Sequence, residues 1–106
     1  MQKVLRGEIL DFVTYEERRA ELRTAAMAEK AVRRVHVGQN LTFLFENTTT
    51  VRYQILEMVR AERMVRESDI AHEIETYNEL LGGPGELGCT LLVEIPTAEE
   101  LSLIHI

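Results

Sequence analysis

The sequence is poor in the residues that most catalytic sites use. It has one cysteine, three histidines and no tryptophan. The lone Cys89 cannot form a disulfide within the chain, which fits a reducing compartment, and its place in an alternating segment predicts a small core residue on a strand. The only serines are Ser68 and Ser102. The sequence therefore does not predict a serine or cysteine hydrolase.

Common cofactor and metal motifs are missing too. There is no Gly-x-Gly-x-x-Gly, P-loop, Cys-x-x-Cys or His-Glu-x-x-His, and the glycine cluster at 82–85 precedes a predicted strand rather than a helix, so it does not form the usual phosphate cradle. Asp69, His72, Glu73 and Glu75 have a helical spacing that could hold a cation. However, His72 falls on the solvent face of its predicted helix, and no second Glu-x-x-His exists for a di-iron bundle. We predict no cofactor and no metal.

Apolar runs and positive patches are also short. The start of the chain lacks the apolar segment of a signal peptide, and no apolar run approaches the length of a membrane span, so we predict a cytoplasmic protein without a membrane partner. The net charge of −6 is uneven, because residues 1–34 carry eight Lys/Arg against six Asp/Glu and residues 35–106 carry four against twelve. Only Lys30, Arg33 and Arg34 cluster, without interleaved aromatics, so nucleic acid is not predicted as a partner.

A long first helix is predicted over residues 14–31. Thr14 and Glu17 have the spacing of a capping box, in which each side chain satisfies a free amide of the first turn. A narrow apolar stripe follows at near-helical spacing. Its members are Tyr15, Leu22, Ala25 and Ala26. The preceding residues 7–12 look like a short turn that closes one end of the core.

Alternation of apolar and polar residues predicts three strands. Residues 33–46 read as a β-hairpin around Gly38-Gln-Asn40. Pairing Val37 with Leu41 places Val35 opposite Phe43, so the large apolar side chains of both strands share one side, the predicted core side. Residues 89–95 alternate in the same way and predict a third strand that ends at Pro96.

A pair of amphipathic helices is predicted between the hairpin and the third strand. Residues 50–66 follow a cluster of good N-cap residues at 47–50 and place Val51, Ile55, Met58, Val59 and Val65 on one face. Residues 69–81 begin after a possible cap at Ser68-Asp69 and end at the glycine cluster. Their apolar residues recur at helical spacing: Ile70, Ile74, Tyr77 and Leu81. The fold class is therefore α+β, with these elements around one core.

The end of the chain suggests a truncated domain. A transposase used to prepare sequencing libraries recognises a DNA end sequence whose translation is identical to residues 101–106. We therefore expect these residues to be a translated adapter on a metagenomic fragment. The alternative is a native apolar last strand. Residues 1–100 are then the N-terminal portion of one α+β domain, interrupted at a helix that Thr97 and Glu100 would cap. A truncated sheet leaves an unpaired edge, so we expect the fragment to self-associate.

Three segments carry a family resemblance: residues 41–63 (LTFLFENTTTVRYQILEMVRAER), 74–78 (IETYN) and 91–96 (LLVEIP). With them, residues 3–100 resemble a bacterial family known as domain of unknown function family 3501. Its members are roughly twice as long, which implies that this chain is the N-terminal half. The family has no established activity and so implies no catalytic residues. Its genes often stand beside those of rubrerythrin-like and iron–sulfur proteins, which implies a link to redox or stress biology. The loop at 82–86 departs from the usual Pro-Asp type.

The candidate ligand or partner site centres on Glu62. On a helical wheel Glu62 falls near the middle of the apolar arc of residues 50–66, and a core-facing carboxylate must be paired, protonated or bound to a cation. Glu57, Arg60 and Arg63 lie nearby on the same helix. Two structural alternatives compete with a functional site: an ion pair with Arg33 or Arg34, or a carboxylate that reaches solvent at the helix end. We regard a structural role as the more common outcome.

His36 is a further candidate on the other side of the hairpin, beside Arg34, Thr42 and Glu46. A histidine can act as a base or a ligand, but a lone one on a strand is more often simply exposed. The shortage of histidine, cysteine and serine favours a non-catalytic accessory or binding domain that acts on a protein partner through its acidic helix pair. The alternative is a fragment of a metal- or small-molecule-dependent enzyme whose site is completed by the missing half.

Overall fold

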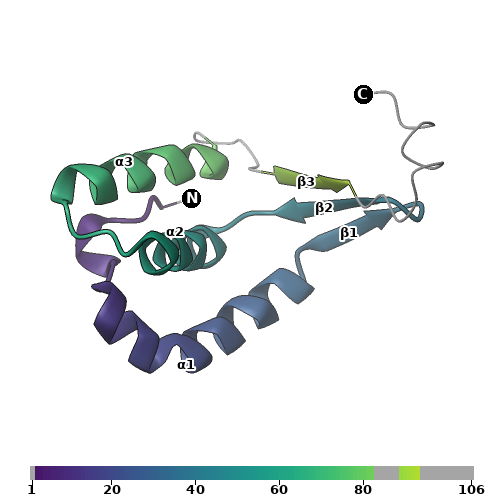
Figure 1. Ribbon diagram of the computed structural model, residues 1–106. Helices are drawn as coiled ribbons and strands as arrows, with labels where there is room; N and C mark the ends of the chain where they lie inside the picture. The colour runs from purple at the N-terminus through teal and green to yellow at the C-terminus, as the bar shows by residue number, and fades with distance from the viewer. Residues whose placement is uncertain (1, 83–88, 94–106) are drawn as a thin grey trace, which may run out of the picture.

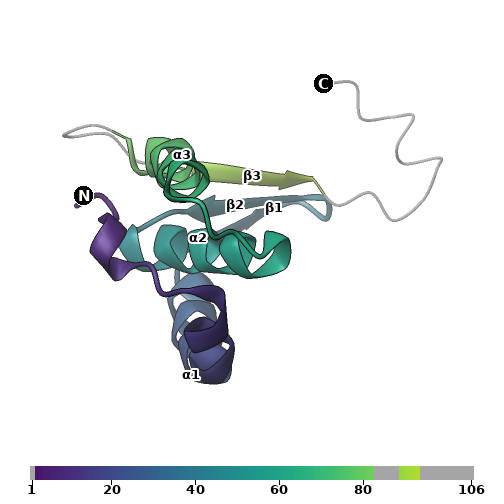
Figure 2. The same cartoon turned by 60° about the vertical axis from the view of Figure 1, so that its left-hand side comes forward.

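The computed structural model describes residues 2–82 and 89–93 (Figure 1). Three α-helices and three strands follow one another in the predicted order, so the α+β class is confirmed. Helix α2 lies between α1 and α3 in both views, and the strands lie to one side of the helices (Figure 1, Figure 2). The elements are η1 (Arg6–Glu8), α1 (Phe12–Ala31), β1 (Arg34–Val37), β2 (Leu41–Phe45), α2 (Thr48–Glu62), α3 (Glu67–Asn78), η2 (Glu79–Leu81) and β3 (Cys89–Val93).

The sheet is antiparallel with strand order β1-β2-β3. The predicted hairpin register is confirmed, since Val35 faces Phe43 and Val37 faces Leu41. Gly38 has φ +69° in the connecting turn, a conformation that glycine adopts without strain. Strand β3 pairs with β2 on its other side, with Phe43 facing Leu91.

The burial of the sheet differs from the prediction. Thr42, Leu44 and Glu46 are buried, whereas Val35 and Val37, on the predicted core side, are each 48% exposed. Polar groups on the buried side have partners, so their burial is tolerated. Cys89, predicted as a core residue, is exposed at the start of β3. The hydrophobic pattern fixed the register correctly but not the side that is covered.

The first helix begins two residues earlier than predicted. Asp11 is the N-cap of α1, and its Oδ1 accepts a hydrogen bond from the Thr14 amide at 2.8 Å. The Thr14 hydroxyl donates to Oδ2 of the same carboxylate at 2.8 Å. The predicted capping box of Thr14 and Glu17 is therefore wrong, because a carboxylate three residues earlier already accepts the free amide.

Replacing Asp11 with alanine is expected to lower the thermal midpoint of unfolding by a few degrees, because the first turn of α1 loses its cap. Its hydrogen bonds with Thr14 lower the pKa of Asp11, so the cap is present above the ordinary pKa of a carboxyl and is lost as the pH falls through the lowered value. Thermal denaturation followed by circular dichroism measures the change. Glu17→Ala is the control and should leave the midpoint unchanged; a larger effect of Glu17→Ala would restore the capping-box interpretation.

Helix α2 is capped as the threonine cluster suggested, but it ends early. Asn47 accepts from the Thr50 amide, and the Thr50 hydroxyl accepts from the Asn47 amide, each at 2.9 Å. The helix stops at Glu62, since Arg63 adopts the left-handed conformation with φ 49°. The predicted extension to residue 66 is wrong. Val65, assigned to the apolar face, is 74% exposed for the same reason.

Helix α3 begins at Glu67 rather than Asp69, and its N-cap, Arg66, makes no side-chain cap hydrogen bond. The proposed cap at Ser68-Asp69 is wrong because both residues already lie in the first turn of the helix. The predicted apolar stripe does face inward. Ile70, Ile74 and Leu81 are buried, the last of them in η2 after the α-helix has ended.

The core lies among the helices. One hydrophobic cluster joins the N-terminal segment, α1, α2, α3 and η2. Its buried members are Val4, Ile9, Tyr15, Val51, Ile55, Leu56, Val59, Ile70, Ile74 and Leu81. Burial of such side chains stabilises a fold by about 1.5–3 kcal/mol each. None of the cluster members belongs to the strands that the structure describes.

The buried side-chain amide of Asn78 joins the end of α3 to the N-terminal segment. Its Oδ1 accepts from the Val4 amide at 2.9 Å, and its Nδ2 donates to the Val4 carbonyl at 3.0 Å. Both groups of the Val4 backbone are thereby satisfied in the interior, as buried backbone requires. The sequence alone gave no sign of this contact across 74 positions.

Several expectations lie outside the described residues: the structure of the glycine-cluster loop, the last two residues of the predicted third strand, the helix proposed at 97–100 and the tail at 101–106. Among the described residues, no helix has both the length and the apolar character needed to cross a membrane.

Candidate functional site

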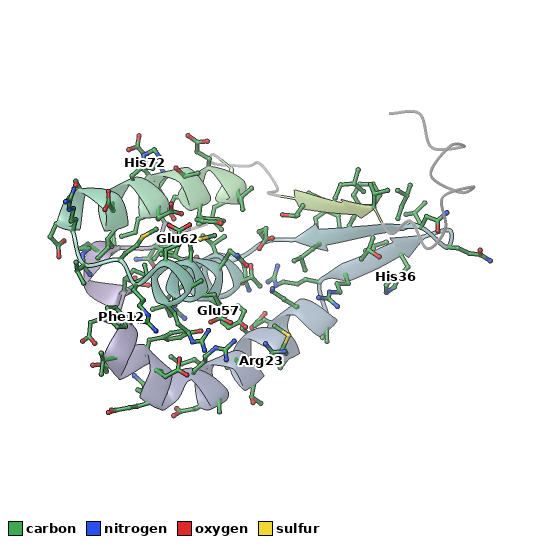
Figure 3. All side chains as sticks on the ribbon, viewed as in Figure 1. Phe12, Arg23, His36, Glu57, Glu62 and His72 are labelled. Carbon is green, nitrogen blue, oxygen red and sulfur yellow. The ribbon has the colours of Figure 1, made fainter. Side chains whose placement is uncertain are left out.

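The structure does not bring the five candidate residues together in one site. His36 lies on β1, away from Glu57 and Glu62 on α2 (Figure 3). Glu57 faces α1 and binds side chains there, whereas Glu62 is exposed at the end of α2. The predicted burial of Glu62 is wrong, because the helix ends at that residue. The carboxylate escapes to solvent at the helix end, which was one of the structural alternatives.

Glu57 forms the best-connected polar cluster of the described residues. Its carboxylate makes a two-point contact with the Arg19 guanidinium, with Nη2 to Oε1 at 2.9 Å and Nε to Oε2 at 3.0 Å. The Tyr53 hydroxyl donates to Oε1 at 2.9 Å, and the Tyr15 hydroxyl donates to Oε2 at 3.1 Å. We call these four residues the Glu57 cluster. It joins α1 to α2, with each carboxylate oxygen accepting two hydrogen bonds.

The electrostatics of the cluster follow from these contacts. The hydrogen bond from Arg19 is the main cause that lowers the pKa of Glu57 to about 2, helped by those from Tyr53 and Tyr15. Burial raises the pKa of Tyr15, whose side chain is inaccessible to solvent, and the hydrogen bond to Glu57 raises it further. The pKa of Tyr53 rises for the same two reasons. Glu57 is thus a carboxylate, and both tyrosines are neutral, across the physiological pH range.

This charge state limits what the cluster can do chemically. A general acid or base works best with a pKa near the working pH, and Glu57 lies far below it. Its oxygens are already occupied by four hydrogen bonds, which leaves little capacity to bind a substrate or cation. The cluster is therefore a structural connection between α1 and α2.

Arg60 lies one turn further along α2 and pairs with Glu16 of α1 (Figure 3 shows the neighbouring Phe12 and Glu57). The Arg60 Nη2 to Glu16 Oε1 distance is 3.3 Å, and Nε of the same guanidinium contacts Oε2. A groove of about 620 Å³ lies beside this pair, between the start of α1 and the end of α2. Its lining residues are Phe12, Val13, Glu16, Glu17, Arg60, Ala61 and Arg63. The groove combines both charges with apolar side chains and is open to solvent.

A second groove, of about 370 Å³, lies at the connection between α2 and α3. Its lining residues are Glu62, Arg63, Met64, Val65, Arg66, Asp69, His72 and Glu73. The proposed cation site at 69–75 falls partly here. In residues 2–82 and 89–93, however, no three histidine, cysteine or acidic side chains are grouped closely enough to hold a metal ion. The lining of this groove carries both positive and negative side chains.

His36 is exposed on β1, and its Nδ1 lies 3.0 Å from the hydroxyl of the buried Thr42 on β2. This hydrogen bond joins directly opposed residues of the hairpin, so it supports the register. The suggested ion pair of Glu62 with Arg33 or Arg34 is not formed among the described residues. The Arg33 Nε contacts Glu29 at 3.3 Å.

Sequence reasoning missed the partners of Glu57, although a signal was present. Tyr15 and Arg19 stand four residues apart on α1, as do Tyr53 and Glu57 on α2. Residues at this spacing share one helix face. Helix α1 therefore presents a tyrosine and an arginine to α2, and α2 presents a tyrosine and a glutamate to α1.

Glu46 was likewise missed as a structural residue. It is 7% exposed and accepts hydrogen bonds from the hydroxyls of Thr50 on α2 and Thr90 on β3, the latter at 2.8 Å. It therefore ties the end of β2 both to the start of α2 and to β3.

The chain resembles known proteins in both sequence and structure. Curated proteins provide no match. A crystal structure of a novel protein of unknown function from Burkholderia pseudomallei K96243 is similar, with a TM-score of 0.85 and 31% sequence identity. The match covers 94% of this chain and 56% of that chain, so the present sequence spans little more than half the length of that relative. Residues 3–104 match the family described as protein of unknown function (DUF3501). The chain therefore belongs to the DUF3501 family.

Proposed function

We propose that the chain is a non-catalytic accessory module that binds a protein partner through the acidic surface of its helix pair. The negative charge of the pair is concentrated on α3 and η2, which together carry five acidic residues and no lysine or arginine. The acidic residues are Glu67, Asp69, Glu73, Glu75 and Glu79. Helix α2 contributes little, because Arg52 and Arg60 balance Glu57 and Glu62.

The placement of Glu75 and Glu79 is the observation that carries the proposal. Both are exposed at the carboxyl end of α3, where the helix dipole disfavours negative charge, and no basic residue lies in the last turn. Among the described residues no ion pair involves either of them. Charges that oppose local stability are typical of sites kept for function. A partner with a basic docking surface would complement them.

The family resemblance narrows the class of partner. The resemblance implies gene neighbours that encode rubrerythrin-like and iron–sulfur proteins, so we propose that the partner is a redox protein of this kind. One feature weighs against catalysis at Glu57: its carboxylate oxygens already accept four hydrogen bonds.

A matched pair of charge-reversal variants tests the proposal. The double variant Glu75→Lys/Glu79→Lys is expected to weaken binding to the rubrerythrin-like protein encoded beside the family gene by about tenfold or more at low salt. The affinity of the unmodified chain should fall as salt rises, because salt screens exposed charges over about 10 Å. Isothermal titration calorimetry in 50 to 300 mM salt measures both effects.

The control is Glu17→Lys/Glu21→Lys, an exposed pair with the same four-residue spacing on α1. It adds the same charge and should leave the affinity within about twofold. Equal loss in both variants would indicate a nonspecific charge effect and contradict the proposal. Stoichiometric iron or zinc in protein purified without added metal would instead favour the metal-dependent enzyme that competes with this proposal.

A further inference from the structure

One face of the sheet is apolar on all three strands. Directly opposed residues of neighbouring strands point to the same side, so the pairs Val35–Phe43 and Phe43–Leu91 place three large side chains on one face. The complete set is Val35, Val37, Leu41, Phe43, Phe45, Cys89, Leu91 and Val93. We call this set the apolar sheet face. It contains no polar or charged side chain other than the Cys89 thiol.

No member of the apolar sheet face is buried. Val35 and Val37 are 48% exposed and Leu91 is 46% exposed. An antiparallel sheet with one covered face normally turns its apolar side to the core and its polar side to water. In the described part of the chain the apolar sheet face is the more exposed one, and Thr42, Leu44 and Glu46 are buried on the opposite side. Contiguous exposed apolar surfaces occur at sites that another protein segment, a membrane or a ligand covers.

The size of the face decides between possible occupants. Three strands about 4.8 Å apart and five residues long at about 3.3 Å per residue span roughly 240 Å². A stable interface between two separate proteins needs about 800 Å² on each partner. This backbone footprint is small for such an interface, which favours an occupant other than a second copy held by this face alone. A segment of the same polypeptide needs less, because the covalent link supplies a high effective concentration.

We infer that the apolar sheet face is the packing surface for the additional part of a full-length DUF3501 chain, which covers it with apolar side chains. The related Burkholderia pseudomallei protein shares this fold at a TM-score of 0.85, and the match accounts for only 56% of its chain. That protein therefore has further polypeptide that the match does not include. The absence of charge on the face requires an apolar occupant, since an unpaired charge would be costly to bury there.

Cys89 provides a specific probe, because it is the only cysteine and its thiol lies at the rim of the face. We compare two proteins: the 106-residue chain, and the same chain joined to the part of the Burkholderia protein that has no counterpart here, in its order in that protein. Labelling of Cys89 by an aromatic disulfide reagent should be fast in the first protein and about 100-fold slower in the second. In the second protein the thiol reacts only when the covering segment transiently leaves the sheet. Equal rates in both proteins would overturn the inference, as would an extended chain without cooperative unfolding.

Two matched variants separate a covering segment from a general gain in stability. Val35→Lys places a charge on the apolar sheet face, whereas Val65→Lys places one on the α2–α3 connection, where Val65 is 74% exposed. Only Val35→Lys should restore fast labelling in the extended chain. Equal effects of the two variants would contradict a covering segment. A stable dimer of the 106-residue chain with a protected Cys89, detected by light scattering, would assign the face to a second copy instead and overturn the inference.

Discussion

Replacing Glu57 with alanine is expected to lower the free energy of unfolding by about 2–3 kcal/mol, because Arg19 and two buried tyrosine hydroxyls lose their common partner. The Tyr15 side chain is inaccessible to solvent, so its hydroxyl cannot turn to water. Arg19 is 32% exposed and recovers part of its hydration, which keeps the loss below that of a fully buried ion pair. Urea denaturation measured at neutral pH gives the free energy directly.

Glu62→Ala is the matched control, since it removes a carboxylate from the same helix at an exposed position. It should change the free energy of unfolding by no more than about 0.5 kcal/mol. If both substitutions had the same small effect, Glu57 would not connect α1 to α2. If Glu57→Ala lost partner binding at unchanged stability, the assignment of Glu57 to structure would be wrong.

The contribution of Glu57 should also depend on pH. Its folded pKa of about 2 lies below the ordinary value of 4.5. A depressed folded pKa means that the stabilisation is fully present above the unfolded value and is lost as the pH falls towards the folded value. The stability difference between the unmodified chain and Glu57→Ala should therefore be constant near pH 7 and shrink between about pH 5 and pH 2. A difference that stays constant down to pH 2 would show that the carboxylate charge is not involved.

The substitution Asn78→Asp is expected to cost about 2–3 kcal/mol although it preserves the shape of the side chain. The Asn78 Nδ2 donates to the Val4 carbonyl at 3.0 Å, and aspartate replaces this donor with an oxygen. At neutral pH the new carboxylate would face that carbonyl in the interior, where an unpaired charge is strongly disfavoured. The expected result is loss of the N-terminal segment from the core before the rest of the protein unfolds.

Native-state hydrogen exchange of the Val4 amide measures this effect, because that amide donates to the Asn78 Oδ1 at 2.9 Å in the unmodified chain. Its protection should fall far more than that of α2 amides. Asn40→Asp, in the hairpin turn, is the control with the same chemical change at a less buried position, and it should leave Val4 protected. Unchanged protection in Asn78→Asp would contradict the importance of this contact.

The sequence predicted the elements whose cause is local. The hairpin register came out correctly because alternation allows only even shifts that keep Val35 and Phe43 on one side. The predicted helix ends were less accurate, since the position of a cap depends on which nearby side-chain oxygen accepts the free amide hydrogen. At the start of α1 that oxygen belongs to Asp11 rather than to Thr14. Glu62 was misplaced because the helical wheel assumed a helix beyond the point where Arg63 breaks it.

The site could be predicted only in part, because it depends on how separate helices meet. Glu57 was recognised as a candidate by its position on α2, but its partners Tyr15 and Arg19 come from α1. Periodicity shows which side of a helix faces inward and says nothing about which neighbour lies there. The prediction of which side of the sheet is covered failed for a related reason. Hydrophobicity shows which residues favour burial, whereas the positions of the other chain segments decide which residues are covered.

The contact between Val4 and Asn78 has a consequence for synthesis of the protein on the ribosome. Asn78 is added 74 positions after Val4, so this contact is not formed while α1, the hairpin and α2 emerge. Val4 is buried in the finished molecule, where both of its backbone groups pair with this late partner. The rate of elongation through α3 therefore sets the earliest moment at which the Val4 backbone can dock in the core.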